Sequence, residues 1–314
     1  MKLLITGGAG FIGSHLVDHF ARQQHDITIF DNLSSGSLEN IAAWRDAPHV
    51  THLIGDCTNP DHVQQALSDH EVILHFAANP EVRISQSPPA TCFTQNVYAT
   101  YLLLEAWRQR PATTLVFASS STVYGDPQIL PTPETHPTHP ISIYGASKLA
   151  SEALITAYTH TYNKQAIMLR LANIIGPRSH HGVIADFIAK LRQTPQRLEI
   201  LGDGTQTKSY LHVSDCVTAI STLLTRSLDP VTALNVGSDD QTSVTQIADI
   251  IVDEMHLTDV TYAFTGGVDA GRGWKGDVKT MLLDIRQLKA QGWHPRYTST
   301  EAVRRTVQAA LRED

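Results

Sequence analysis

Tyr144 and Lys148 have the residue types and the spacing that acid–base chemistry requires. They lie four residues apart in a segment with helical character, so both side chains project from one helical face. A tyrosine hydroxyl has an ordinary pKa of about 10, and a lysine ammonium one turn away favours the phenolate and lowers that pKa. Tyr144 is therefore a candidate general base, with Lys148 as its electrostatic partner. Ser120, at the end of an apolar segment, could hydrogen-bond the same substrate hydroxyl.

The same spacing also has a purely structural explanation. Taken alone, a tyrosine four residues before a lysine is a common helical pattern, with a half-exposed aromatic ring and a solvated cation. The catalytic interpretation therefore depends on other features of the chain. One of them is the segment 114–121, an apolar strand that ends in three serines.

The other feature is a glycine-rich segment, residues 7–14, which follows the apolar run 3–6. An apolar strand that leads into a glycine loop and then into an amphipathic helix has the layout of a dinucleotide-binding turn. Gly7 permits the tight turn, Gly10 lets the backbone approach a pyrophosphate, and Gly13 lets the helix pack closely on the strand. The helix N-terminus then faces the phosphates.

A carboxylate decides between nucleotide binding and a loop that only joins a strand to a helix. The apolar run 27–30 predicts a second strand, and Asp31 ends it. Asp31 stands about 20 residues beyond the loop, where a carboxylate accepts hydrogen bonds from an adenosine ribose and would repel a 2′-phosphate. No arginine or lysine follows within residues 32–37. The sequence therefore predicts NAD rather than NADP. The positive nicotinamide ring of bound NAD would act together with Lys148 to favour the phenolate of Tyr144.

Apolar strand segments alternate with helical segments through the first half of the chain, without an internal repeat. This alternation is typical of an α/β fold with a doubly wound, Rossmann-like parallel sheet. Beyond Pro177 the alternation decays, which predicts a smaller, discontinuous C-terminal substrate domain. We expect an NAD-binding domain of residues 1–176, with 209–240 returning to it, and a substrate-binding domain of residues 177–208 and 241–314.

The composition of the chain limits which partners and which cellular location we expect. The 314 residues include 24 Lys+Arg and 31 Asp+Glu, a net charge of −7 without a charged block, which argues against nucleic acid and membrane as partners. The first strand begins directly after the initiator methionine, and no apolar run approaches the ~20 residues of a membrane span, so we expect a cytoplasmic protein. The three cysteines are unclustered and the 16 histidines lack metal-ligand spacing, so we expect no metal site.

The series of motifs resembles an extended short-chain dehydrogenase/reductase, and within that superfamily a nucleotide-sugar epimerase of the UDP-glucose 4-epimerase type. The resemblance covers essentially the whole chain. The motifs that carry it are GGAGFIGS at 7–14, DNLSSG at 31–36, GD at 55–56, HFAANPEVR at 75–83, SSSTVYG at 119–125, YGASK at 144–148, NIIGPR at 173–178, GDGTQTKSYLHVSD at 202–215 and GWKGD at 273–277.

The resemblance implies a role for each matching residue. Ser120, Tyr144 and Lys148 correspond to the catalytic residues of the family. The residues implied to contact NAD are Gly7, Gly10, Phe11, Ile12, Gly13, Asp31, Asn32, Asp56, Ala77, Tyr144 and Lys148. The residues implied to contact the substrate are Arg83, Ser120, Asn173, Arg178, Lys208, Arg272, Asp277 and Met281.

Two of these positions depart from the pattern of the family. Lys208 replaces an arginine that many relatives carry, so a point charge replaces a bidentate grip on phosphate. The late Arg-x-Gly-Asp motif is also stretched, so that either Arg272 or Lys275 could reach the diphosphate. Met281 occupies the gate position, where a flexible, mid-sized side chain suggests that a hexose fits easily.

The implied reaction is a redox-neutral 4-epimerisation of UDP-glucose and UDP-galactose through a transient 4-keto intermediate. Ser121 and Thr122 stand where the related dehydratases carry an Asp-Glu pair, so water elimination lacks its acid and base. A UDP-glucuronate 4-epimerase is the first alternative, with Arg83, Arg178, Ser85 or Thr122 meeting the carboxylate. The others are a net oxidoreductase that releases NADH and a catalytically silent NAD-binding scaffold or sensor.

The oligomeric state is a separate expectation. Helical segments 91–108 and 146–162 carry apolar residues beyond a single core stripe, which suits a four-helix interface between two copies. Burial of both segments against the sheet would explain the same pattern. Because relatives of this family are commonly dimers, a homodimer is expected.

Overall fold

The computed structural model describes residues 1–82, 88–110 and 113–312 and contains two compact units. The first unit comprises Met1–Val123, Ile143–Arg170 and Thr225–Leu234. The second comprises Tyr124–Ser142, Leu171–Leu224 and Asn235–Asp314. The assignment of an NAD-binding and a substrate-binding domain to particular stretches of the chain stays a prediction.

The first unit holds most of a seven-stranded parallel sheet in the order β11-β6-β5-β4-β1-β2-β3. Chain order runs outward from β1 to β3 on one side and from β4 to β6 on the other, so the doubly wound, Rossmann-like sheet is confirmed. Ligands of such sheets bind at the carboxyl ends of the strands where the order reverses, here β1 and β4. The strands are β1 (Lys2–Thr6), β2 (Asp26–Asp31), β3 (Val50–Ile54), β4 (Val72–His75), β5 (Thr114–Ser120), β6 (Gln165–Leu171) and β11 (Val231–Val236).

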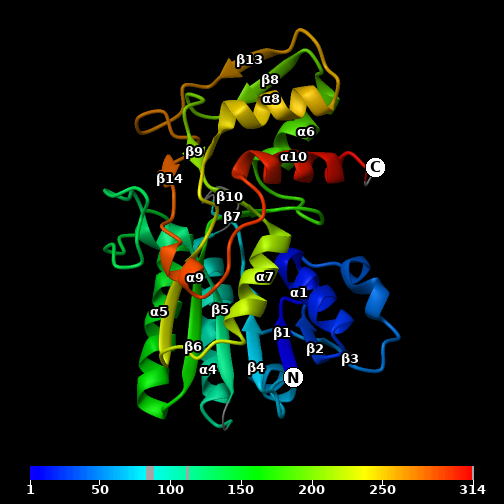
Figure 1. Ribbon diagram of the computed structural model, residues 1–314, viewed down its shortest axis with the longest axis vertical. Coiled ribbons are helices and arrows are strands. Elements are labelled where there is room, and N and C mark those ends of the chain that lie inside the picture. Colours follow the sequence, from blue (N-terminus) through cyan, green and yellow to red (C-terminus); the bar gives the residue numbers. More distant parts are fainter. Residues whose placement is uncertain (83–87, 111–112, 313–314) are drawn as a thin grey trace. The chain divides into compact units, whose positions relative to one another are not determined.

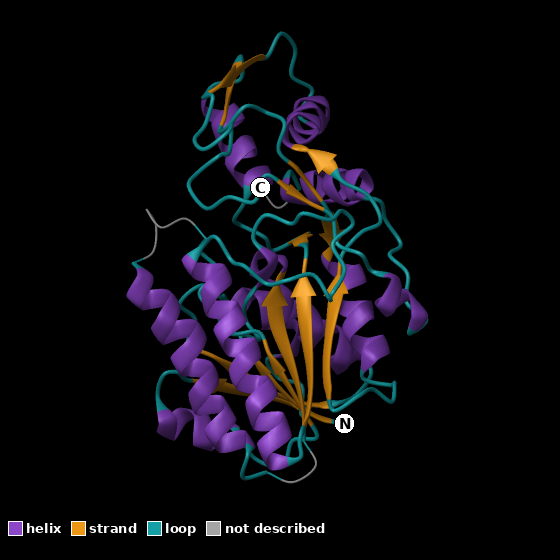
Figure 2. Cartoon of the chain, turned by 90° about the vertical axis from the view of Figure 1, so that its left-hand side faces the viewer, coloured by secondary structure: helices purple, strands orange, loops and turns teal. Residues whose placement is uncertain are grey.

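The central strands are apolar throughout rather than alternating. Leu3, Leu4 and Ile5 of β1 are all fully buried, because helices cover both faces of a doubly wound sheet. The long helices lie side by side along one face of the sheet (Figure 2), and α1 lies next to β1 and β2 (Figure 1). The helices and short helical turns of this unit are α1 (Phe11–Arg22), η1 (Leu38–Trp44), α2 (Pro60–Ala66), α3 (Pro89–Cys92), η2 (Phe93–Tyr98), α4 (Ala99–Trp107), η3 (Ser121–Tyr124) and α5 (Ile143–Tyr162).

The second unit has its own core and several small sheets. Two of these sheets are parallel pairs, β7 with β10 and β8 with β13, and the third has the order β12-β9-β14. Capping boxes begin two of its helices, α8 and α10. Its elements are β7 (Asn173–Ile175), α6 (Val183–Gln193), β8 (Arg197–Ile200), β9 (Thr207–Lys208), β10 (Tyr210–His212), α7 (Val213–Leu223), β12 (Thr242–Ser243), α8 (Val244–Glu254), β13 (Thr261–Phe264), β14 (Thr280–Met281), α9 (Arg286–Ala290) and α10 (Ser299–Ala310).

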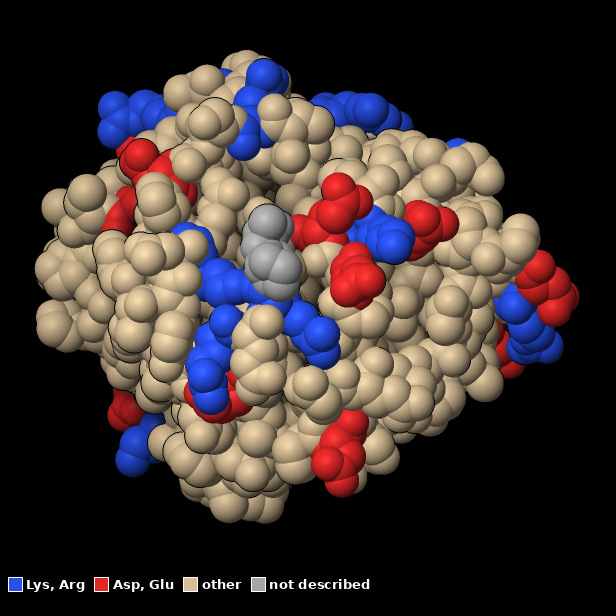
Figure 3. All heavy atoms as spheres, turned by 90° about the horizontal axis from the view of Figure 1, so that it is seen from below, with Lys and Arg blue, Asp and Glu red and all other residues tan. Residues whose placement is uncertain are grey.

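The surface charge, the hydropathy of the helices and the cysteines bear on the possible partners of the chain. The face drawn in Figure 3 carries lysines and arginines interspersed with aspartates and glutamates. No helix in the described parts of the chain is long and apolar enough to cross a membrane. Cys57, Cys92 and Cys216 are buried free thiols. Within residues 1–82, 88–110 and 113–312, no three His, Cys, Asp or Glu side chains gather in a way that could hold a metal ion.

Candidate active site

The three candidate catalytic residues meet in the first unit, where β5 ends beside α5. The Lys148 ammonium donates a 2.8 Å hydrogen bond to the carbonyl oxygen of Ala118. The same nitrogen lies 5.7 Å from the centroid of the Tyr144 ring, as the one-turn spacing predicts. The Tyr144 hydroxyl is hydrogen-bonded to the side chain of Ser120. The fold therefore brings a phenol, a hydroxyl and a cation to one place.

The hydrogen bonds of Ser120 fix which way its proton points. The Ser120 Oγ accepts hydrogen bonds from the Thr122 amide at 3.2 Å and from the Thr122 hydroxyl at 2.9 Å. With two donors aimed at its oxygen, Ser120 has its own proton available for the Tyr144 oxygen or for a substrate oxygen. The sequence pattern marks Thr122 as a position without the carboxyl group of the dehydratases and as a possible partner of a uronate carboxylate. In the structure its hydroxyl orients Ser120.

Burial dominates the titration of both members of the tyrosine–lysine pair. Burial raises the pKa of Tyr144 to about 12, although the hydrogen bond to Ser120 acts in the opposite direction. Burial also lowers the pKa of Lys148 to about 8, and the negative charge of Glu152 opposes that shift. The sequence-based expectation of a lowered tyrosine pKa relied on Lys148 together with a positive nicotinamide ring. The protein groups alone leave Tyr144 protonated at neutral pH.

An irregular helix supports the catalytic helix from behind. Residues 93–98 form a π-helical segment, η2, between α3 and α4, and such segments often mark functional sites. In this segment the Asn96 side chain accepts a 2.8 Å hydrogen bond from the Asn79 amide and donates a 3.0 Å hydrogen bond to the Ser147 hydroxyl. Ser147 in turn donates to the carbonyl oxygen of Tyr144 at 2.7 Å. Propensity rules carry no signal for a π-helical segment, so sequence analysis missed this support.

The glycine loop between β1 and α1 is packed too closely for side chains. Gly7 has φ +69°, and a Cβ there would lie 2.7 Å from the Ala77 nitrogen. A Cβ on Gly13 would lie 2.0 Å from the Gly7 carbonyl oxygen, whereas one on Gly10 would lie 3.1 Å from that oxygen. Helix α1 carries Phe11, Ile12 and Gly13 in its first turn and begins at Gly10 without a side-chain cap. Its N-terminus is thus of the kind that binds phosphate.

Two carboxylates stand at the ends of the neighbouring strands. Asp31 is buried, and its oxygens accept hydrogen bonds from the amides of Ala9 at 3.0 Å and Leu33 at 2.8 Å. Asn32 donates to Asp56 at 3.2 Å. Burial alone would raise the pKa of Asp56, but hydrogen bonds from Thr58 and Asn32 outweigh it and lower that pKa. Asp31 is therefore held as an acceptor against the glycine loop, and Asp56 is held as an acceptor beside Asn32.

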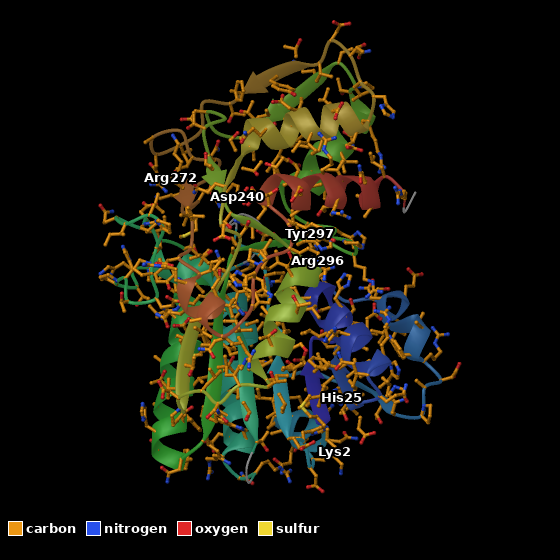
Figure 4. The ribbon with its side chains drawn as sticks, viewed as in Figure 1. Lys2, His25, Asp240, Arg272, Arg296 and Tyr297 are labelled. Carbon is orange, nitrogen blue, oxygen red and sulfur yellow. The ribbon has the colours of Figure 1, made fainter. Side chains whose placement is uncertain are left out.

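Most of the residues expected to contact the substrate lie in the second unit, where several of them are paired. The Lys208 ammonium lies 2.6 Å from the Asp277 carboxylate and 5.4 Å from the centroid of the Trp274 ring. Met281 is buried in β14 and is the register partner of Lys208 in β9. Arg272, labelled in Figure 4, donates to both carboxylate oxygens of Asp126, at 2.9 and 2.7 Å. No sequence pattern points to Asp126, which lies 146 positions from Arg272.

The remaining expected substrate contacts are more dispersed. Asn173 begins β7, and its side-chain amide donates to the carbonyl oxygen of Ser209 at 3.1 Å. Arg178 follows β7 in a left-handed backbone conformation, with φ +66°. Lys275 is exposed, whereas Arg272 is partly buried. Arg83 lies outside the described residues. The roles of all these residues in binding stay predictions.

Comparison with known proteins identifies the family. A model of the NAD dependent epimerase/dehydratase family matches residues 3–237, which is most of the chain. The chain belongs to this family. The "UDP-glucose 4-epimerase" of Mycolicibacterium smegmatis is 32% identical over 98% of each chain. Among solved structures, a UDP-galactose 4-epimerase is 41% identical, with a TM-score of 0.88 over 100% of this chain and 99% of that one. A UDP-glucuronic acid 4-epimerase from Bacillus cereus is 25% identical, with a TM-score of 0.90 and complete coverage of both chains.

The glycine loop fits the dinucleotide on which this epimerase/dehydratase family depends. A Cβ at Gly7 or Gly13 would collide with neighbouring backbone, so glycine is needed at both positions for the close packing of the loop at the start of α1 that a dinucleotide-binding turn has. Asp31 and Asp56 lie at the carboxyl ends of β2 and β3, and Lys148 bonds to β5 near its carboxyl end. The prediction of NAD is therefore confirmed. The contact of each of these residues with NAD stays a prediction.

Proposed function

We propose that this family member is an NAD-dependent 4-epimerase that interconverts UDP-glucose and UDP-galactose. The observation that carries the proposal is the contact among Ser120, Tyr144 and Lys148, with hydroxyl groups rather than carboxylates at positions 121 and 122. A phenol and a cation suit removal and return of a proton at a secondary alcohol. Elimination of water would need a further acid and base. The epimerase relatives named above support the same reaction.

Each residue has a defined task in this reaction. Tyr144 takes the proton of the sugar C4 hydroxyl, Ser120 donates a hydrogen bond that orients this oxygen, and Lys148 supplies positive charge beside the phenolate. Bound NAD would supply the redox chemistry, as acceptor and then donor of the C4 hydride. The 4-keto sugar turns over between the two transfers and receives the hydride on its other face. Tyr144 then returns the proton, so the reaction is redox-neutral.

The second unit provides the cations for the diphosphate. Lys208 and Arg272 are both held by carboxylates, Asp277 and Asp126 respectively. Because Arg272 is partly buried in this network and Lys275 is exposed, we assign the diphosphate to Arg272 and Lys208. Buried Met281 lines up beside Lys208 and would limit the space next to the hexose. Asn173 and Arg178 complete the proposed set.

The first experiment offers the purified chain, without added cofactor, either UDP-glucose or UDP-glucuronate, and follows the C4 epimer by NMR. Formation of UDP-galactose supports the proposal and shows that NAD is retained. Formation of UDP-galacturonate alone would replace the substrate with a uronate and direct attention to Arg178. Stoichiometric NADH release would indicate a net oxidoreductase. Bound NAD without turnover of either sugar would indicate a scaffold or sensor.

We further propose that two copies pair through α4, α5 and the adjoining η2. Exposed aromatic side chains gather on these elements, among them Phe93 at 61% exposure and Tyr101 at 40%. Tyr98 stacks on Tyr101 with ring centroids 6.2 Å apart, and Tyr158 lies 5.4 Å from Tyr162. An aromatic surface of this kind is typical of the core of a protein interface. The cytoplasmic location stays a prediction.

A further inference from the structure

A buried ion pair lies directly behind the candidate catalytic residues, and the proposed reaction does not use it. Arg170 of β6 donates to the Glu152 carboxylate of α5 through its terminal nitrogen at 2.8 Å and through Nε at 3.1 Å. The two side chains are only 10% and 5% exposed. A third partner, the Ser119 hydroxyl, donates to the same carboxylate at 2.5 Å. All three residues belong to the first unit.

The hydroxyl of Ser119 completes an ordered set of contacts between β5 and α5. The strand ends with Ala118, Ser119 and Ser120, and each of these residues bonds to a different turn of α5. The Ala118 carbonyl accepts from Lys148, Ser119 donates to Glu152, and Ser120 bonds to Tyr144. The three helix positions are four residues apart and share one helical face. The position of Ser120 against Tyr144 is therefore coupled to the bond one residue earlier.

A stabilising role alone does not explain this ion pair. Removing two charges from water is unfavourable, and apolar side chains of similar volume often give equal or greater stability at such sites. A bidentate arginine–carboxylate pair does provide fixed geometry. Here that geometry orients the carboxylate oxygen that receives the Ser119 hydroxyl.

The charge of Glu152 also acts on Lys148, which stands one turn before it. The titratable groups that face Lys148 are Tyr144 and Glu152 on its own helix and His75 on β4, whereas β5 presents the Phe117 ring and a carbonyl. Burial lowers the pKa of His75 to about 3, so this imidazole is neutral. Glu152 therefore supplies the opposing negative charge that keeps the pKa of Lys148 from falling further than burial would drive it.

We propose that Glu152, held by Arg170, is a positioning residue: it fixes Ser119, and through it Ser120, against the helix that carries Tyr144 and Lys148. This inference rests on the proposed epimerase reaction, since it assigns a task to Glu152 in that reaction. It assigns no contact between Glu152 and the substrate or cofactor. Its consequences fall on kcat and on the titration of the catalytic residues.

The first test removes only the bond between strand and helix. Ser119→Ala leaves the Glu152–Arg170 pair intact, so the fold should persist. We expect kcat to fall by about tenfold, from looser positioning of Ser120, while KM stays within about twofold. The matched control is Thr159→Val, which removes a buried hydroxyl of α5 that donates to the Ile155 carbonyl of the same helix at 2.8 Å. This control should keep the kcat of the unaltered enzyme. Equal kcat values for Ser119→Ala and Thr159→Val would overturn the proposal.

The second test separates the effect of the Glu152 charge from the effect of its side-chain length. Glu152→Gln keeps the side-chain length and removes the charge, so Lys148 loses its proton at lower pH. We expect the alkaline limb of the kcat profile to move down by roughly one pH unit. Glu152→Asp keeps the charge but shortens the side chain, so kcat should fall without movement of that limb. Unshifted profiles for both variants, with unchanged kcat, would contradict the inference.

A third measurement does not need the substrate to be known. Tyrosinate absorbance is titrated in each variant with NAD bound, since the positive nicotinamide ring lowers the pKa of Tyr144. The titration of a matching protein that also carries Tyr144→Phe is subtracted. Ser119→Ala should move the Tyr144 titration to higher pH, because a displaced Ser120 no longer stabilises the phenolate. Thr159→Val should not. A clear shift without turnover of any UDP-sugar would reject the proposed function and retain the positioning role. Turnover without a shift would retain the proposed function and reject the positioning role.

Discussion

Tyr144 can act as a base only when positive charge lies near its hydroxyl group. Burial raises its pKa to about 12, so the phenol stays protonated near neutrality unless Lys148 and a bound nicotinamide ring together favour the phenolate. Without substrate, the Ser120 hydroxyl donates a hydrogen bond to the Tyr144 oxygen, since the Thr122 amide and hydroxyl both donate to the Ser120 oxygen. The chemistry of this site therefore depends on the cofactor as much as on the side chains.

Removing the phenol hydroxyl should abolish proton transfer and leave binding intact. Tyr144→Phe keeps the ring in place, so we expect kcat for epimerisation to fall by roughly 10²–10⁴-fold while NAD remains bound. Steady-state kinetics and the NAD content of the purified protein measure the two effects. Tyr162→Phe, which removes a hydroxyl from the far end of the same helix, is the control and should retain normal turnover. A Tyr144→Phe enzyme with near-normal kcat would assign the base elsewhere.

His75 should make the protein sensitive to acid. It lies buried between the hydroxyls of Thr6 at 2.7 Å and Thr100 at 3.1 Å, and burial lowers its pKa from 6.5 to about 3. Between about pH 3 and pH 6.5, His75 therefore binds a proton in the unfolded chain but not in the folded chain. The contribution of neutral His75 to the free energy of unfolding is fully present above pH 6.5. It decreases as the pH falls, by roughly 2 kcal/mol at pH 5.

Urea unfolding at pH 7 and pH 5 measures this loss. His75→Asn should lose less stability between the two pH values than the unaltered chain, whatever its absolute stability. His180→Asn changes an exposed histidine and should behave like the unaltered chain. An identical loss in all three proteins would show that other groups cause the acid sensitivity.

At the scale of elements, the loop between β1 and α1 contains glycines with different tasks, some needed for packing and others for cofactor binding. A Cβ on Gly13 would overlap the Gly7 carbonyl oxygen at 2.0 Å, so Gly13→Ala should destabilise the fold by roughly 1–3 kcal/mol or more. Gly10→Ala meets the same oxygen at 3.1 Å, so its effect on stability should be smaller. Its added methyl should instead weaken NAD binding. Thermal unfolding and NAD titration of both variants check this contrast, and equal losses of stability would contradict it.

Local elements were predictable because their signals are local. Runs of apolar residues predicted the parallel strands, and the glycine spacing predicted the turn between β1 and α1. The four-residue interval predicted that Tyr144 and Lys148 share one helical face. Long-range partners were not predictable, because no periodicity links them. Asp126 meets Arg272 from 146 positions away, and Glu152 receives Ser119 from 33 positions away. Such pairs exist only once the fold brings their elements together.

At the scale of the whole molecule, the aromatic surface on η2, α4 and α5 predicts that the 34.5 kDa chain pairs in solution. Light scattering coupled to size exclusion should give a mass about twice that of one chain. Tyr101→Lys places a charge in this surface, and a desolvated, unpaired charge at an interface is costly, so we expect the mass to fall toward that of a monomer.

The matched control for the pairing surface is Phe264→Lys, which changes an aromatic residue of similar exposure, 46%, in the second unit. It should leave the mass of the dimer unchanged, because β13 takes no part in the proposed interface. Circular dichroism of both variants confirms that each remains folded. If Tyr101→Lys stayed dimeric, or if Phe264→Lys dissociated the dimer, the pairing surface would lie elsewhere. A chain that is monomeric without any substitution would leave these aromatic residues without a partner copy and contradict the proposal.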